Sequence, residues 1–388
     1  MADLSWTAEQ RRSRLMRRHG LNRNAGGVSE TVRSVVAAHS SDPATPYLAS
    51  WARMAAFKTS DLDSALVDQR SVWRLHAMRR TLFVVPSDQR HLFEAGASRD
   101  IAIKERRRLE GWLESVVPEP AAWLEAVAEK ISGLLEGVEM RTQDLAGAIP
   151  EMSTKVKVGS GKWATETPVS SRLLFLLAME GRLVRTRSSA TWRSSQYHWT
   201  RADTWLAPAD PVDPDVARRK LLRLYLYSYG PATLTDIRWW TGWTQRTTRP
   251  ALEGGDIVAV AVDGNQAYTL AGDEPHEAEE EGGLVALLPG LDSTPMGWKQ
   301  RDWYLGDHGG SLFDRNGNVG PTVWVDGRIV GGWAQEPGGQ VVWEALEALP
   351  PGTTRAIDAE AGELSEWLDG TVVTPRFRTS LERRLSAT

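Results

Sequence analysis

Apolar and polar residues along this chain follow two periods, one typical of helices and one typical of strands. The predicted order of elements is clearest in the third quarter of the chain, where Gly230 and Pro231 end a helical pattern. Further on, Asp263, Gly264 and Asn265 form a strong turn signal between two stretches of alternating apolar and polar residues. We expect three helices followed by a β-hairpin. The predicted elements cover residues 218–227, 233–240 and 244–252 as helices, and 257–262 and 267–270 as strands.

The middle of the chain repeats this order. Thr167 and Pro168 are typical of a helix start, with an N-cap residue followed by proline, and Gly181 is typical of a helix end. Arginine and tryptophan recur in the two strands that follow. The predicted elements are helices at 121–135, 143–149 and from 167 to 181, and strands at 182–187 and 192–199.

The first part of the chain gives a fainter version of the same order. Thr7 and Gln10 have the spacing of a capping box in front of a basic helix. Alternating residues later in this part predict a hairpin that Pro86 closes. The predicted elements are helices at 29–38, 43–54 and 60–67, and strands at 72–77 and 80–85.

Three helices followed by a hairpin is the plan of the winged helix, which serves in DNA binding and also in protein docking. Near the C-terminus, strands are predicted at 321–325 and 328–333 around Asp326 and Gly327. We therefore predict an α+β fold with three tandem winged-helix units and a small β-rich C-terminal domain. The expected domains are 1–118, 119–210, 211–272, an acidic linker at 273–283, and 284–388.

Composition excludes several classes of protein. The 388 residues include no cysteine, so a disulfide scaffold, a thiolate zinc site, an iron–sulfur cluster and a cysteine nucleophile are all excluded. There is no apolar run of about 18 residues and no apolar signal core at the N-terminus. We expect a cytoplasmic, nucleoid-associated protein without a membrane partner. The Asp and His residues show no defensible ligand spacing, so no metal or cofactor is predicted.

The formal net charge of −4 conceals an uneven distribution. Seven arginines but only three acidic residues lie within residues 1–38, and six arginines but only Glu180 lie within 172–201. Six carboxylates at 273–281 offset them and are typical of a solvated linker. The basic N-terminal half is therefore the part expected to face DNA, although arginines also commonly just solvate helix surfaces.

Several motifs give the chain a family resemblance. In order, they are HSSDP at 39–43, YLASWAR at 47–53, MRRTLFVVP at 78–86, GPAT at 230–233, DIRWW at 236–240, MGWKQRDWYL at 296–305, FDRNGNVGPT at 313–322 and GRIVGGW at 327–333. With these motifs the chain resembles the winged-helix DNA glycosylases related to the azinomycin-resistance enzyme, in an actinobacterial-type branch. The resemblance implies tandem winged helices and hydrolysis of the N-glycosidic bond of bulky, alkylated or crosslinked purines.

The sequence departs from this family at the expected catalytic motif. Characterised members have Gln-x-Gln or Gln-x-Asp at a helix end, and here the matching positions are His39 and Ser41. Neutral His39 could accept a proton from water while Ser41 orients it, and Asp42 could orient His39 or stabilise a cationic sugar. The alternatives are a DNA contact, or His39 capping helix 29–38 and Asp42 capping the next helix. The helix end would also favour an imidazolium, which would repel a cationic base.

Candidate DNA-binding residues are arginines near the motif and in the hairpins, together with a basic loop. His76 lies on the strand before the first hairpin turn, and we interpret it as a histidine on the face of that strand rather than as a second catalytic group. The alternative for the arginines is a solvated wing. The DNA-binding candidates are Arg53, Arg79, Arg80, Lys162, Trp163, Arg185, Arg187 and Arg193.

Two functions remain in competition at this point. One is a monofunctional DNA repair glycosylase that acts on bulky or N7-alkylated purines in damaged double-stranded DNA as a monomer. No lysine lies near His39 to form a Schiff base, which argues against strand cleavage. The other is a catalytically silent DNA-binding protein, either a damage sensor or a transcription regulator. A scaffold that binds only protein is a weaker third hypothesis, and a flat salt dependence of duplex binding would identify it.

Overall fold

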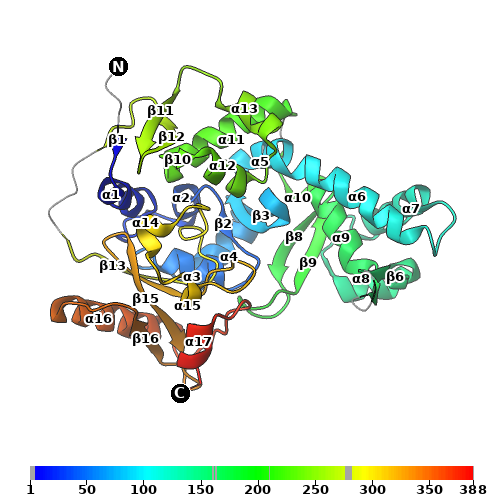
Figure 1. The fold of residues 1–388 in the computed structure, drawn as a ribbon. Coiled ribbons are helices and arrows are strands. Elements are labelled where there is room, and N and C mark those ends of the chain that lie inside the picture. The colour runs from blue at the N-terminus through cyan, green and yellow to red at the C-terminus, as the bar shows by residue number, and fades with distance from the viewer. Residues whose placement is uncertain (1–4, 160, 162–163, 209, 276–281, 388) are drawn as a thin grey trace.

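The computed structural model describes residues 5–159, 161, 164–208, 210–275 and 282–387 of the chain. Helices and several small sheets are mixed along the sequence, which confirms the α+β class (Figure 1). A large body holds the N-terminal, third-quarter and C-terminal segments, and a smaller lobe extends from it along a long helix, α6 (Arg99–Leu113).

One order of elements recurs three times: helix, short strand, two helices, then two strands. In each case the short strand pairs antiparallel with the last strand of the hairpin. The first unit comprises α2 (Val28–Ser34), β2 (Ala38–His39), α3 (Thr45–Trp51), α4 (Thr59–Val67), β3 (Val72–His76) and β4 (Leu82–Pro86).

The second and third units follow the same order. The second comprises α7 (Pro120–Leu134), β5 (Met140–Arg141), α8 (Thr142–Ala148), α9 (Ser170–Met179), β8 (Leu183–Ser188) and β9 (Tyr197–Arg201). The third comprises α11 (Pro214–Tyr229), β10 (Ala232–Thr233), α12 (Leu234–Thr241), α13 (Gln245–Leu252), β11 (Ile257–Val262) and β12 (Asn265–Leu270). Short helices α5 (Arg90–Phe93) and α10 (Ala202–Trp205) lie at the junctions with the second unit.

The second unit carries a hairpin that the sequence analysis assigned differently. The helix expected to begin at Thr167 begins instead at Ser170, because β7 (Thr165–Pro168) pairs with β6 (Lys155–Val158). The Val169 amide donates to the Thr154 carbonyl at 2.9 Å, and this bond closes the hairpin before the helix starts. Likewise, the strand expected over 192–199 begins only at Tyr197.

The N-terminal helix α1 (Ala8–Arg18) begins with the expected capping box of Thr7 and Gln10. Of its five arginines, however, Arg11 and Arg14 are buried, Arg12 and Arg18 are partly buried, and Arg17 is exposed. Arg14 is buried, donates to the Gly230 carbonyl at 2.6 Å and pairs with Asp273, a residue of the acidic stretch. The charge of the buried Arg14 therefore stabilises the fold rather than facing DNA. Most of the acidic stretch, 276–281, lies outside the described residues.

The C-terminal segment is mixed rather than β-rich. Ile357, Ala361, Leu364 and Leu368 repeat at helical spacing and are buried, which gives α16 its apolar face. The turn at Asp326 and Gly327 forms as expected. The segment comprises a sheet of β13 (Val285–Leu288), β14 (Thr322–Val325), β15 (Arg328–Gln335) and β16 (Val341–Ala345), with helices α14 (Asp302–Leu305), α15 (Gly309–Leu312), α16 (Pro351–Leu368) and α17 (Ser380–Leu385).

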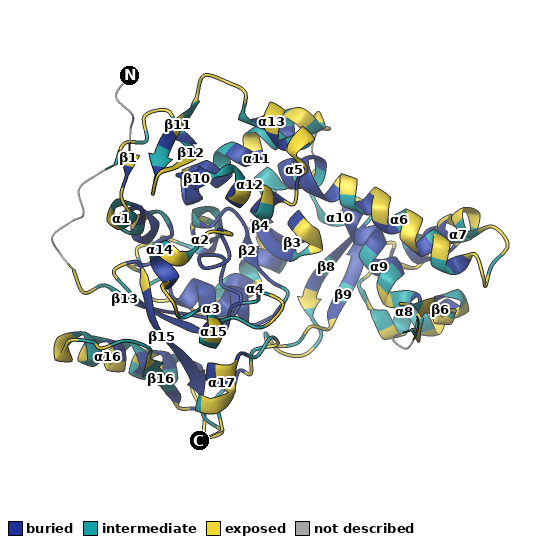
Figure 2. Cartoon of the chain, in the orientation of Figure 1, coloured by how far each residue is buried: buried dark blue, intermediate teal, exposed yellow. Residues whose placement is uncertain are grey.

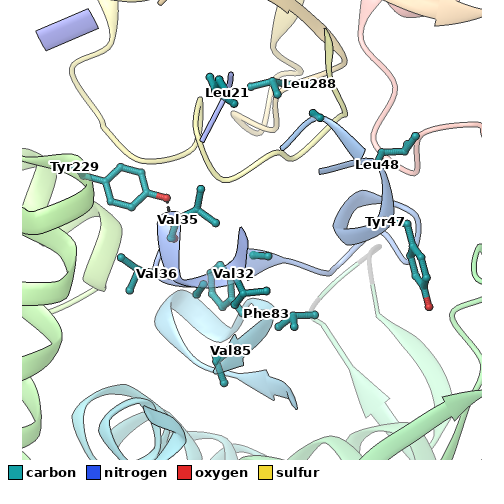
Figure 3. Close-up of a cluster of buried hydrophobic side chains, with 14 of the residues drawn as sticks. Leu21, Val32, Val35, Val36, Tyr47, Leu48, Phe83, Val85, Tyr229 and Leu288 are labelled. Carbon is teal, nitrogen blue, oxygen red and sulfur yellow. Dashed lines mark hydrogen bonds between the residues drawn. The ribbon is translucent and has the colours of Figure 1, made fainter. Parts of the chain in front are cut away.

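Buried residues occur both in the large body and in the smaller lobe (Figure 2), and they form two main clusters. One is confined to the second unit and its approach helix, between Leu109 and Trp199. The other joins the first unit, the third unit and the C-terminal segment, and Figure 3 shows Val32, Tyr229 and Leu288 packed within it. The Tyr229 hydroxyl donates to the Val35 carbonyl at 3.0 Å. This shared core fixes the C-terminal segment against the first unit.

Among the described residues, no helix is long and apolar enough to cross a membrane.

Candidate functional site

His39 lies on a strand, not at the end of a helix. The helix expected over 29–38 ends at Ser34, because Val36 adopts a left-handed backbone with φ of 62° and turns the chain into β2. His39 then pairs with Phe83 of β4. The interpretation of His39 as a helix cap is therefore wrong, and the macrodipole argument for its imidazolium form does not apply.

The His39 ring is buried and neutral. Burial, together with the nearby charge of Arg79, lowers its pKa to about 3. Its Nδ1 accepts a long hydrogen bond of 3.4 Å from the Ser41 backbone amide. A neutral ring that accepts at Nδ1 carries its hydrogen on Nε2. In this tautomer His39 supports the Ser41 loop and has no free lone pair to accept a proton from water.

Asp42 connects this loop to the C-terminal segment. Its carboxylate accepts from the Ala44 amide at 3.1 Å and from the Arg376 amide at 2.8 Å, and burial raises its pKa. The Arg376 guanidinium donates to the Ser41 carbonyl at 3.2 Å. Asp42 therefore positions Arg376 beside Ser41, and both its oxygens are already used.

Replacing Asp42 by alanine should release the Arg376 segment. The two orphaned amides predict a loss of about 1–3 kcal/mol in the free energy of unfolding and faster hydrogen exchange at residues 371–378. Asp42→Asn keeps one acceptor oxygen and should give an intermediate result. Hydrogen exchange followed by mass spectrometry measures both variants, and unchanged exchange in Asp42→Ala would contradict this role.

A cavity of about 300 Å³ opens beside Ser41, and we name it the Ser41 cavity. One wall of this cavity is formed by neighbouring residues of the sheet β2-β4-β3 in the first unit. His76 pairs with Leu82, and the Leu82 carbonyl accepts from the Ser40 amide at 2.8 Å, so these three residues lie side by side across the strands. The full lining is Ser40, Ser41, Pro43, His76, Leu82, Arg185, Ser195, Tyr197, Arg376 and Phe377.

Three polar groups in this lining are buried without a hydrogen-bond partner: Ser40 Oγ, His76 Nε2 and the Tyr197 hydroxyl. Leaving a buried polar group unpaired costs about 1–3 kcal/mol, so three around one hollow are unusual for packing alone. All three atoms are shielded from solvent in this conformation, so a bound polar ligand or water would satisfy them once neighbouring side chains move aside. The arrangement is therefore that of a binding site.

The lining carries positive charge and no carboxylate. Arg185 is half-buried and stacks on Trp199, with 4.3 Å from its guanidinium carbon to the ring centre, while Arg376 is exposed at the edge. Burial lowers the pKa of Arg185 to about 10, which leaves it charged at neutral pH. Two guanidiniums beside neutral hydroxyls suit an anionic backbone such as a phosphodiester.

A second hollow, of about 260 Å³, lies between α6 and α9 and contains Arg80 and Glu105. Glu105 pairs with Arg80 at 2.9 Å and with Arg108 at 2.8 Å. None of the residues that line this hollow has a buried polar atom without a partner. Its chemistry is already satisfied within the chain, unlike that of the Ser41 cavity.

Arg53 does not lie on the surface that the sequence analysis assigned to DNA. It is fully buried and forms two hydrogen bonds of 2.8 and 2.9 Å with Asp292. It also donates to Thr294 and to the His19 carbonyl. Its guanidinium makes all these bonds inside the protein and does not reach the solvent. The prediction that Arg53 contacts DNA is therefore wrong, and Arg53 belongs to the core.

The remaining candidates lie on the surface in different settings. Arg79 lies 4.0 Å above the Trp239 ring, and Arg187 pairs with Glu139 at 2.9 Å. Arg193 is exposed and donates to the Val372 carbonyl. Arg80 forms the ion pair with Glu105 described above. Lys162 and Trp163 lie outside the described residues.

The structure thus brings Ser41 and Arg185 together at one cavity, with Asp42 outside its lining, and adds residues that the sequence did not indicate. Tyr197 and Arg376 reach the cavity only through contacts between the second unit, the C-terminal segment and the first unit. Neither lies in a motif, so no sequence signal marks them. Within the described part of the chain, no group of three or more His, Cys, Asp or Glu residues could hold a metal ion.

Comparison with known proteins places this geometry in context. Residues 32–367 match the sequence profile described as DNA glycosylase AlkZ-like. The interstrand DNA cross-link repair glycosylase of Streptomyces sahachiroi is 26% identical over 259 residues, which is 61% of this chain and 64% of that protein. The solved structure of Streptomyces sahachiroi DNA glycosylase AlkZ has a TM-score of 0.73 at 20% identity, covering 96% of this chain and 100% of the other. At that identity, the structural likeness establishes the fold alone.

Proposed function

This chain belongs to the AlkZ-like DNA glycosylase family, and from that membership we propose that it is a monofunctional DNA repair glycosylase. Its substrate would be damaged double-stranded DNA with a bulky or N7-alkylated purine, and it would act as a monomer. The observation that carries the proposal is the Ser41 cavity, which lies at the motif position and has unpartnered polar groups. The three repeated units would serve as winged helices that hold the duplex.

The chemistry required is modest, because an N7-alkylated purine is cationic and already a good leaving group. The protein must hold one water molecule near the sugar and favour an oxocarbenium-like state. We assign the first task in part to Ser41, a residue of the cavity lining, with His39 as a positioning residue that accepts from the Ser41 amide. Both histidines near this cavity are kept neutral by burial, which lowers their pKa and avoids repulsion of a cationic substrate.

Phosphates near the reacting sugar would supply the negative charge that the cavity lining lacks. Arg185 is positioned to bind one of them at the cavity, and Arg79 extends the basic surface. Each such contact should add to the salt dependence of duplex binding. The proposed DNA contacts are Arg79, Arg80, Arg185, Arg187 and Arg193, with Lys162 and Trp163 carried over from the sequence.

Incubation of the purified protein with defined lesions tests this function. We expect release of free base from a 7-methylguanine duplex, from a bulky N7-adduct duplex, or from both, measured by mass spectrometry, and none from an unmodified duplex. The strand should remain intact until alkali is added, as hydrolysis without lyase activity requires. Tight binding to both lesions without base release would instead favour the silent DNA-binding alternative.

A further inference from the structure

We propose that His76, rather than His39, accepts the hydrogen bond from the hydrolytic water in the Ser41 cavity. This inference rests on the proposed glycosylase function and assigns its water-binding acceptor. His76 is the last residue of β3 and lies across from Leu82, in the same sheet row as Ser40. Its ring is therefore directed by the sheet to the wall of the cavity, where it is one of the lining residues.

The turn after β3 fixes the tautomer of His76. Arg79 and Arg80 both adopt left-handed backbone conformations, with φ of 54° and 66°. This tight turn brings the Arg80 carbonyl to 3.2 Å from His76 Nδ1. A carbonyl can only accept, so Nδ1 carries the hydrogen and a neutral ring has its lone pair on Nε2.

That lone pair is buried and has no hydrogen-bond partner within the described chain. The ring cannot easily turn away, because its centre lies 4.5 Å from that of Phe175 in an edge arrangement and Nδ1 is bonded. His76 lines the cavity but Nε2 itself is shielded in this conformation, so a small movement of the lining must admit a water molecule to this unpaired acceptor. His39 lacks both features: its Nδ1 lone pair already accepts from the Ser41 amide, and the residue does not line the cavity.

Burial and the charges of Arg185 and Arg80 lower the pKa of His76 well below its ordinary value. The ring is thus neutral at physiological pH and does not repel a cationic nucleotide. Such a weak base acts mainly by orienting the water, with the Ser41 hydroxyl as a second contact. Arg185 and Arg376 flank this position and would bind the phosphates of the same nucleotide.

The reaction step balances as a hydrolysis. The water oxygen forms a bond to C1′ of the deoxyribose while the bond from C1′ to the purine nitrogen breaks. The electron pair of the broken bond leaves with the base, which departs neutral if it was alkylated at N7. The proton lost by the water is released to the solvent while the hydrogen bond to His76 Nε2 orients the attacking oxygen, and an abasic site with a 1′-hydroxyl remains.

Two substitutions separate this role from packing. His76→Phe keeps the ring shape and the contact with Phe175 but has no acceptor. His76→Gln has an amide NH₂ that can donate to the Arg80 carbonyl and an oxygen that can accept from water. We expect single-turnover release of 7-methylguanine or a bulky N7 adduct to fall about 10²-fold or more in His76→Phe and less than about tenfold in His76→Gln.

Duplex affinity and the melting temperature, measured on the same proteins, show whether a variant has merely lost binding or folding. His91→Ala, on α5 and outside the cavity lining, is the control and should match the wild type. If the wild type releases base and His76→Phe does so at a rate within about threefold of it, the assignment to His76 is wrong while the proposed function stands. A wild type that releases no base from either lesion would overturn the proposed function, and this inference with it.

Discussion

Replacing Arg53 by methionine should lower the free energy of unfolding by about 3–5 kcal/mol, because Asp292 would remain as a buried charge without its partner. Neither side chain has appreciable solvent exposure, and the shortest distance between them is 2.8 Å. Burial alone would raise the pKa of Asp292, but the charge and hydrogen bonds of Arg53 outweigh burial and lower it. Urea unfolding followed by tryptophan fluorescence measures the loss.

The effect should be large because Arg53 joins three parts of the chain. Its guanidinium contacts Asp292 and Thr294, which precede the C-terminal helices, and its Nε donates to the His19 carbonyl at 3.0 Å. The same Thr294 hydroxyl lies 2.9 Å from His19 Nδ1. Removing the Arg53 guanidinium therefore leaves several buried hydrogen-bonding groups without a partner.

A matched surface pair gives the control. Arg33 and Asp88 are 2.6 Å apart but exposed, so Arg33→Met should cost no more than about 1 kcal/mol. The double variant Arg53→Met/Asp292→Leu should recover much of the loss, since an apolar pair can replace a buried ion pair. A loss below about 1 kcal/mol in Arg53→Met, with a reduced salt slope of duplex binding, would restore Arg53 to the DNA surface.

Local sequence signals predicted the elements whose causes are local. The Thr7 capping box and the Asp263–Gly264 turn formed as expected, because each depends on a few neighbouring residues. The helix expected through Ala38 failed where a tertiary contact decided the outcome. Residues 38–39 are extended because β4 pairs with them, and the pattern of apolar residues is compatible with either form.

The candidate site shows the same division. Ser41 was found because the family motif marks its position, and Arg185 because it lies in a predicted hairpin. Tyr197 and Arg376 are brought together by packing between segments about 180 residues apart, which no single-sequence pattern encodes. Arg53 was misplaced for a related reason: charge suggests exposure, and only the fold shows that Asp292 compensates it in the core.

The buried histidines predict a steep loss of stability in mild acid. Burial lowers the pKa of His19 to about 3 and that of His39 to about 3, while the ordinary value is 6.5. Between these values the unfolded chain binds protons that the folded chain excludes, so stability is fully present above pH 6.5 and falls as the pH decreases. From pH 7 to pH 5 each histidine should cost about 2 kcal/mol, at about 1.4 kcal/mol per unit.

Two histidines together would then remove about 4 kcal/mol, a large fraction of the 5–15 kcal/mol typical of a folded protein. His19→Gln tests the assignment, because glutamine can still accept from Thr294 and donate to Ser228, yet does not titrate. The unfolding free energy of this variant should change by about 2 kcal/mol less between pH 7 and pH 5 than that of the wild type. If the wild type is equally stable at both pH values, the histidines must accept protons in the folded state, and the neutral rings assigned to His39 and His76 would be wrong with them.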